Sequence, residues 1–161
     1  NTDLEGVTFL NGSVLDISEK IDPASCDLIL CIGLIGHVGG LDRMLEMFRN
    51  LLSETGQLLL QTTLLDHVGV RATRFFSERR HIKKNGYAIK HYWHNDIVQA
   101  CSKHGLAIVE SRRHGFDLPF LDRVAPGFGH YLERRFASRA ERTGSEAIYV
   151  LARTGNSVED K

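Results

Sequence analysis

Residues 26–63 read CDLILCIGLIGHVGGLDRMLEMFRNLLSETGQLLLQTT. The stretch opens with a nearly continuous apolar run over 26–33, which is typical of a strand buried on both faces of a parallel sheet. Apolar residues then recur over 41–52 at the period of a helix, and charged residues take the other side. The apolar segment 57–62 predicts a second strand. Strands alternating with helices predict an α/β fold with a mostly parallel sheet.

The flanking segments extend this pattern in both directions. We expect a strand at 6–10 followed by a turn at 11–13, a helix within 70–80, a helix at 96–104 capped by Asn95 and ended by Gly105, and strands at 106–112 and 147–153, the last of which can run antiparallel. Residues 113–145 read as an insertion with a basic helix near 128–142. The predicted organisation is one partial domain over 1–154 and a polar tail over 155–161.

The composition narrows the class of protein. Lys and Arg total 20, and Asp and Glu total 20, so the 161-residue chain has no net charge. Neither nucleic acid nor a membrane is expected as a partner, because no general field attracts a polyanion and no apolar run reaches the roughly 20 residues that span a bilayer. Cys26, Cys31 and Cys101 read as free thiols in a reducing compartment, so we expect a cytoplasmic protein. His91 and His94 form a single H-x-x-H pair, which provides too few ligands to predict a metal site.

Several segments in this order resemble the class I S-adenosylmethionine-dependent methyltransferases. The resemblance rests on VTFLNGSVLDI (7–17), the stretch 26–63, WHNDIVQACSKHGLAIVES (93–111) and EAIYVLAR (146–153). It implies a Rossmann-like fold with an antiparallel last strand, and S-adenosylmethionine as the cofactor. The ordered set is moderately specific, although no single motif is diagnostic.

Three departures from the family pattern affect the predicted site. The glycine-rich motif after the family's first strand and the acidic residue after its second are absent. Ser13 stands where the family has Asp, and Thr55-Gly56-Gln57 keeps only one glycine of a pair. In the family order 3-2-1-4-5-7-6, residues 6–10 correspond to strand three and 26–33 to strand four, so the first two family strands are missing and 26–33 presents an open edge. We expect an amino-terminal segment, a partner chain or a second copy to complete the sheet.

The resemblance assigns roles to individual residues. Gly12, Ser13 and Val14 stand where the family holds the adenine, and Cys31, Ile32 and Gly33 lie at the carboxyl end of a strand, where open α/β sheets bind ligands. Both segments also read as ordinary turns.

Other residues are candidates for contact with the methyl acceptor. His37 is the candidate general base, with a structural histidine as the alternative. His67, His91, Tyr92 and Trp93 are candidates for binding the substrate. The simpler interpretation is that they pack in the core or lie on the surface.

The resemblance therefore implies methyl transfer from S-adenosylmethionine to a small-molecule acceptor at oxygen or nitrogen. In this interpretation the chain forms the carboxyl-terminal part of the enzyme and carries half of the cofactor site. The alternative is a degenerate methyltransferase-like module that binds or regulates a partner without activity, which Ser13 favours. A nicotinamide-dependent Rossmann enzyme ranks below both, because no G-x-G-x-x-G lies between a strand and a helix.

Overall fold

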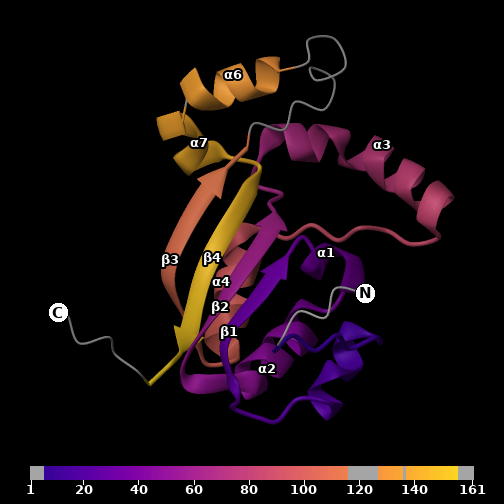
Figure 1. Ribbon diagram of the computed structural model, residues 1–161. Coiled ribbons are helices and arrows are strands. Elements are labelled where there is room, and N and C mark those ends of the chain that lie inside the picture. The colour runs from indigo at the N-terminus through magenta and orange to yellow at the C-terminus, as the bar shows by residue number, and fades with distance from the viewer. Residues whose placement is uncertain (1–5, 116–126, 136, 156–161) are drawn as a thin grey trace.

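The computed structural model describes residues 6–115, 127–135 and 137–155. Its elements are the 3-10 helix η1 (Val14–Glu19), β1 (Cys26–Ile32), α1 (Ile35–Val38), α2 (Leu41–Leu51), β2 (Leu52–Thr63), α3 (Val68–Asn85), α4 (His94–Lys103), β3 (Leu106–His114), α6 (Phe128–Arg135), α7 (Ala137–Thr143) and β4 (Glu146–Arg153). The strands form one sheet in the order β1-β2-β4-β3 (Figure 1). β1 and β2 are parallel, and β4 runs antiparallel to both β2 and β3. The α/β prediction and the antiparallel last strand are confirmed.

One face of the sheet carries the hydrophobic core. The register aligns Cys31 with Leu60 and Leu60 with Tyr149, so these side chains share a face. The apolar sides of α2 and α4 pack into the same buried cluster, through residues that include Met44 and Ile97. The helical period at 41–52 therefore does what the sequence predicts: it turns one stripe of α2 toward the sheet.

The other face of β1 is open. Leu28, Leu30 and Ile32 alternate with core residues and remain about 60% exposed. Within the described residues β1 pairs only with β2, so it forms an edge of the sheet. The prediction that 26–33 is buried on both faces is wrong for this chain, because its described helices that enter the core cover one face alone. An open edge beside exposed leucines agrees with the expected need for something that completes the sheet.

The strand predicted at 6–10 does not form. The described chain there has no ladder partner, and it continues into η1, where Ser13 is the N-cap. A strand needs a neighbour to satisfy its backbone groups, and no described strand lies next to this segment. Of the turn expected at 11–13, the structure shows a bend at Gly12, directly before the N-cap Ser13.

Several boundaries also differ from the sequence prediction. Helix α4 begins at His94, and its N-cap is Trp93 instead of Asn95. The backbone N–H of Trp93 donates to Asp96 Oδ2 at 3.3 Å, which stabilises the start of α4. Gly56 lies inside β2, since that strand begins at Leu52. A Cβ at Gly56 would lie 2.5 Å from the carbonyl oxygen of Cys26, so the approach of β1 to β2 requires glycine there.

The insertion predicted at 113–145 begins inside the sheet. β3 continues to His114, and the expected basic helix is two helices, α6 and α7, which lie beyond one end of the sheet (Figure 1). Helix α3 is longer than expected, covering Val68–Asn85. Residues 156–161 of the predicted tail lie outside the described residues.

Candidate functional site

A cleft of about 240 Å³ opens at the carboxyl ends of the two parallel strands. Its lining comes from the loop after β1, helix α1, the end of β2, the loop after α3 and the start of β4: Gly33, Gly36, His37, Gln61, Thr62, Thr63, Ile89, Lys90, His91 and Glu146. Parallel neighbouring strands place their carboxyl ends at the same edge, which is where open α/β sheets bind ligands. The cleft is therefore in the position that the fold favours for function.

Two glycines shape the wall of the cleft nearest β1. Gly33 has a φ of +64°, and a Cβ there would meet open space. Gly36 lies against the loop after α3: its carbonyl accepts from the Lys90 N–H at 2.8 Å, and a Cβ would lie 2.8 Å from the Lys90 carbonyl oxygen. This close approach joins α1 to the segment that carries Lys90 and His91, so both sides of the cleft are held together by backbone contacts.

His37 is held by rings from α3 and the loop after it. Its Nδ1 lies 2.9 Å from the Tyr87 hydroxyl. The ring of His81 is 4.9 Å from that of Tyr87 and 5.8 Å from that of His37. A histidine with one ring nitrogen fixed by a partner keeps the other nitrogen for a second role. The structure therefore brings together His37 and a positioning partner that the sequence did not indicate.

The polar side of the cleft comes from β2 and β4. Gln61 Nε2 donates to Glu146 Oε2 at 2.6 Å, and His114 Nε2 lies 3.8 Å from the same carboxylate oxygen. Thr62 is buried, whereas Gln61 and Glu146 are half-buried. This part of the cleft offers a carboxylate and amide and hydroxyl groups to a polar ligand.

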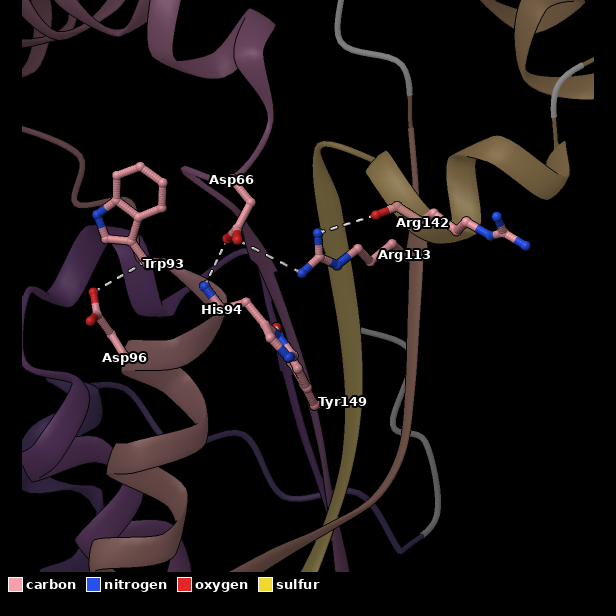
Figure 2. A network of polar contacts seen from close by, with 7 residues as sticks. All are labelled: Asp66, Trp93, His94, Asp96, Arg113, Arg142 and Tyr149. Atoms are coloured by element: carbon pink, nitrogen blue, oxygen red, sulfur yellow. Dashed lines mark hydrogen bonds and ion pairs between the residues drawn. The ribbon is translucent and has the colours of Figure 1, made fainter.

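A second polar network lies beside the end of β2 (Figure 2). Asp66 Oδ2 accepts from the backbone N–H of His94 at 2.8 Å, and Arg113 lies 3.9 Å from the same carboxylate. His94 Nδ1 is 2.7 Å from the Tyr149 hydroxyl. Arg113 also donates to the carbonyl of Arg142 at 3.4 Å, which ties α7 to β3. These contacts fix the start of α4 against β3 and β4.

The ionisation of this network follows from burial. Desolvation lowers the pKa of His94, the positive charge of Arg113 lowers it further, and Asp66 partly opposes both. Burial raises the pKa of Tyr149 to about 12. A neutral His94 therefore faces a protonated Tyr149, and the two share one hydrogen bond between Nδ1 and the hydroxyl.

The three residues predicted to bind the cofactor at the end of β1 lie in different surroundings. Gly33 lines the cleft, but Cys31 is 1% exposed and points into the core, and burial raises its thiol pKa to about 11. Ile32 lies on the open face of the sheet. Any cofactor contact from Cys31 would have to come from its backbone, so its predicted role stays a prediction in that narrower form.

The predicted adenine segment is not a formed pocket. Gly12 and Ser13 border a hollow of about 10 Å³, which is too small for a purine. The Ser13 Oγ accepts from the Leu15 N–H at 3.2 Å as the cap of η1. Val14 begins that helix. The described residues here do not fit an adenine, so this binding role remains a prediction.

The predicted acceptor residues do not gather in one place. His91 lines the cleft with His37, whereas Tyr92 lines a separate hollow of about 640 Å³ between α2 and α4. Burial raises the pKa of Tyr92, and the nearby backbone N–H of Leu41 partly opposes that shift. Trp93 lies beneath the guanidinium of Arg71, whose Cζ is 5.8 Å from the ring. His67 is the N-cap of α3, and its buried Nδ1 has no partner among the described residues.

Sequence reasoning missed most of the polar lining. Gln61, Thr62 and Thr63 end an apolar strand with polar residues, a signal that was readable in QLLLQTT. Glu146 gave no such signal, because it reaches the cleft only through the antiparallel pairing of Thr63 with Glu146. Lys90 comes from a loop whose path no local pattern reveals.

Comparison with known proteins gives a structural match and no sequence match. Neither a protein-family model nor a curated protein sequence matches the chain. A chain of the Haloferax volcanii complex between the Trm112 methyltransferase activator and a methyltransferase superposes with a TM-score of 0.64 at 16% identity, over 95% of this chain and 64% of that one. A SAM-dependent methyltransferase from Archaeoglobus fulgidus gives 0.60 at 8% identity, over 88% and 66%. Mitomycin 7-O-methyltransferase gives 0.56 at 16% identity, over 91% and 34%.

The chain has the class I methyltransferase fold. Its sheet order β1-β2-β4-β3 corresponds to strands 4-5-7-6 of that fold, which confirms the fold predicted from the sequence. The chain spans 34–66% of the length of these three solved chains. Among the described residues, the open space at Gly33 leaves room for a ligand to approach the backbone at the end of β1.

Proposed function

We propose that this chain forms the acceptor side of an S-adenosylmethionine-dependent methyltransferase that acts at oxygen or nitrogen of a small molecule. One observation carries the proposal: in a methyltransferase fold, the cleft at the ends of β1 and β2 contains a histidine held by Tyr87. At about 240 Å³ the cleft lies just below the usual range for small-molecule sites, which favours a small acceptor.

His37 has the geometry of a general base. When Nδ1 donates its hydrogen to the Tyr87 hydroxyl, Nε2 keeps its lone pair and can take a proton from a hydroxyl or amine. The bound cofactor would supply an electrophilic methyl group on its sulfonium. Gln61 and Glu146 would orient the polar part of the acceptor, and Gly33 would allow it to approach the backbone.

The open edge of β1 indicates how the site would be completed. A segment before Asn1, a partner chain or a second copy would pair with β1 and cover Leu28 and Leu30. The Haloferax volcanii structure is described as a complex with a methyltransferase activator, which supports a partner chain as one route. Mitomycin 7-O-methyltransferase supports a small molecule modified at oxygen. A cytoplasmic location remains part of this proposal.

The test measures cofactor binding before activity. Calorimetry with S-adenosylmethionine is run on the folded chain alone and on the chain purified with whatever completes its sheet. Micromolar binding in the completed form supports the proposal, and His37→Gln should then lower kcat by about 10²–10⁴-fold while binding is kept. His104→Gln is the matched control, because that histidine contacts Asp42 at the far end of α4.

The alternative, a methyltransferase-like module that binds or regulates a partner without activity, predicts that S-adenosylmethionine does not bind. It is favoured by the hollow of about 10 Å³ at Ser13, which leaves no room for an adenine. A folded and completed sample that binds no S-adenosylmethionine would overturn the enzyme proposal and support the module. Unchanged kcat in His37→Gln would overturn the role of the histidine alone.

A further inference from the structure

The basic residues of this chain are concentrated on three helices. Helices α3, α6 and α7, here called the basic cap, contain ten of the chain's 20 Lys and Arg but three of its 20 Asp and Glu. Their formal charge is therefore +7, and the rest of the neutral chain carries −7. Figure 1 shows all three helices beyond the same end of the sheet. The ten basic side chains are exposed: Arg71, Arg74, Arg79, Arg80, Lys83, Lys84, Arg134, Arg135, Arg139 and Arg142.

This separation of charge changes the expectation drawn from composition. A net charge of zero predicts no attraction for an anionic surface only when the charges are mixed. Here a positive end and a negative body make the protein strongly polar, so an anionic surface orients it with the basic cap foremost.

Helix α3 also exposes three large apolar side chains along one side. Val68, Phe75 and Ile82 are seven residues apart, so they lie on one side of the helix, and they are 68%, 56% and 45% exposed. Val70, on the opposite side, is buried. The structure therefore buries Val70 and leaves the α3 stripe (Val68, Phe75 and Ile82) largely exposed, with charged side chains between its members.

We propose that the basic cap and the α3 stripe dock this protein on the surface of an anionic membrane. Positive charge attracts acidic lipid headgroups, and an apolar stripe between basic residues enters the boundary between headgroups and acyl chains. Arg71 and Arg79 lie close to the stripe on the helix, as their spacing from Phe75 places them one turn away. Exposed Phe128 and Tyr131 on α6 add rings of the kind that favour this boundary.

The stripe distinguishes a membrane from a nucleic acid. Single-stranded nucleic acids are bound by basic residues together with flat rings on which bases stack. Two members of the α3 stripe, Val68 and Ile82, are aliphatic and offer no such surface. The third, Phe75, already carries the Arg79 guanidinium 4.1 Å from its ring centroid. The charge suits both partners, but the aliphatic side chains of Val68 and Ile82 suit lipid.

Docking does not require insertion across the bilayer. Among the residues that the structure describes, no helix is long and apolar enough to cross a membrane. An interfacial helix instead lies in the plane of the surface, and its binding depends on salt and on acidic lipid.

Vesicle flotation tests the proposal with the whole chain. The probes are vesicles of phosphatidylcholine alone and of phosphatidylcholine with about one third phosphatidylglycerol. We expect binding to the acidic vesicles only, weakened at least about tenfold by Arg79→Glu/Lys83→Glu and also by Val68→Ser/Phe75→Ser/Ile82→Ser. Matched controls are Arg43→Glu/Arg112→Glu and Val98→Ser/Val109→Ser, which change exposed residues outside the basic cap and should bind as the wild type does.

Three results would overturn the proposal. The first is equal binding to both kinds of vesicle, or binding to neither, by a sample whose circular dichroism shows a folded chain. The second is a serine variant of the α3 stripe that binds as tightly as wild type, which would reduce the contact to charge alone. The third is tight binding of a labelled oligouridine together with no vesicle binding, which would assign the basic cap to nucleic acid. None of these depends on methyl transfer.

Discussion

Replacing Tyr149 by Phe removes one hydroxyl from the interior and keeps the ring that fills the space. The Tyr149 side chain is 0% exposed, and its hydroxyl forms a hydrogen bond with His94 Nδ1 at 2.7 Å. A net hydrogen bond contributes about 1 kcal/mol, and a half-buried ring nitrogen left without a partner adds part of its desolvation cost. We therefore expect Tyr149→Phe to lower the free energy of unfolding by about 1–2 kcal/mol at about pH 7.5, where His94 is neutral.

A double-mutant cycle separates this bond from other effects of the substitution. Urea unfolding followed by circular dichroism gives the free energies of wild type, Tyr149→Phe, His94→Leu and the double variant. The coupling energy should be about 1 kcal/mol, because the two side chains also stack with ring centroids 5.7 Å apart. Tyr131→Phe is the control, since that exposed tyrosine should change stability by less than about 0.5 kcal/mol. A Tyr149→Phe cost no larger than the control's, or a coupling near zero, would refute this account of the network.

Three further results are expected. Burial lowers the pKa of His94 in the folded chain, so the unfolded chain binds more protons below the ordinary histidine pKa of about 6.5. The free energy of unfolding should therefore fall as the pH drops below that value. In urea titrations at several pH values, His94→Leu should reduce this pH dependence. Gly56→Ala should cost about 1–3 kcal/mol in thermal melts, because its Cβ would meet the Cys26 carbonyl at 2.5 Å, and a loss under about 0.5 kcal/mol would contradict that contact. A thiol reagent should label Cys26 first, because Cys31 and Cys101 are buried with pKa values raised to about 11, whereas equal rates for all three would show that the core opens readily.

Local patterns were sufficient to predict the main elements. The 3.6-residue period at 41–52 became α2, and the apolar segments at 26–33 and 147–153 became β1 and β4. These features depend on neighbours along the chain, so periodicity and turn residues reveal them. The strand predicted at 6–10 failed for the opposite reason, since a strand exists only where another strand pairs with it.

The site was predictable only in part. Gly33, His37 and His91 come together in the cleft, because they follow elements whose order the sequence showed. Tyr87 could not be assigned to His37, fifty residues away, because their contact depends on where α3 ends.

By itself, the sequence determined the alternation of strands and helices, the apolar stripe that α2 turns to the sheet, and a total charge of zero. Only the tertiary structure decided which polar side chains share the cleft: Glu146 reaches Gln61 through an antiparallel register that no local pattern encodes. It also decided where the charge lies, because folding gathers the basic helices at one end of the sheet (Figure 1). Composition adds charges without regard to position, whereas binding depends on their distances in space.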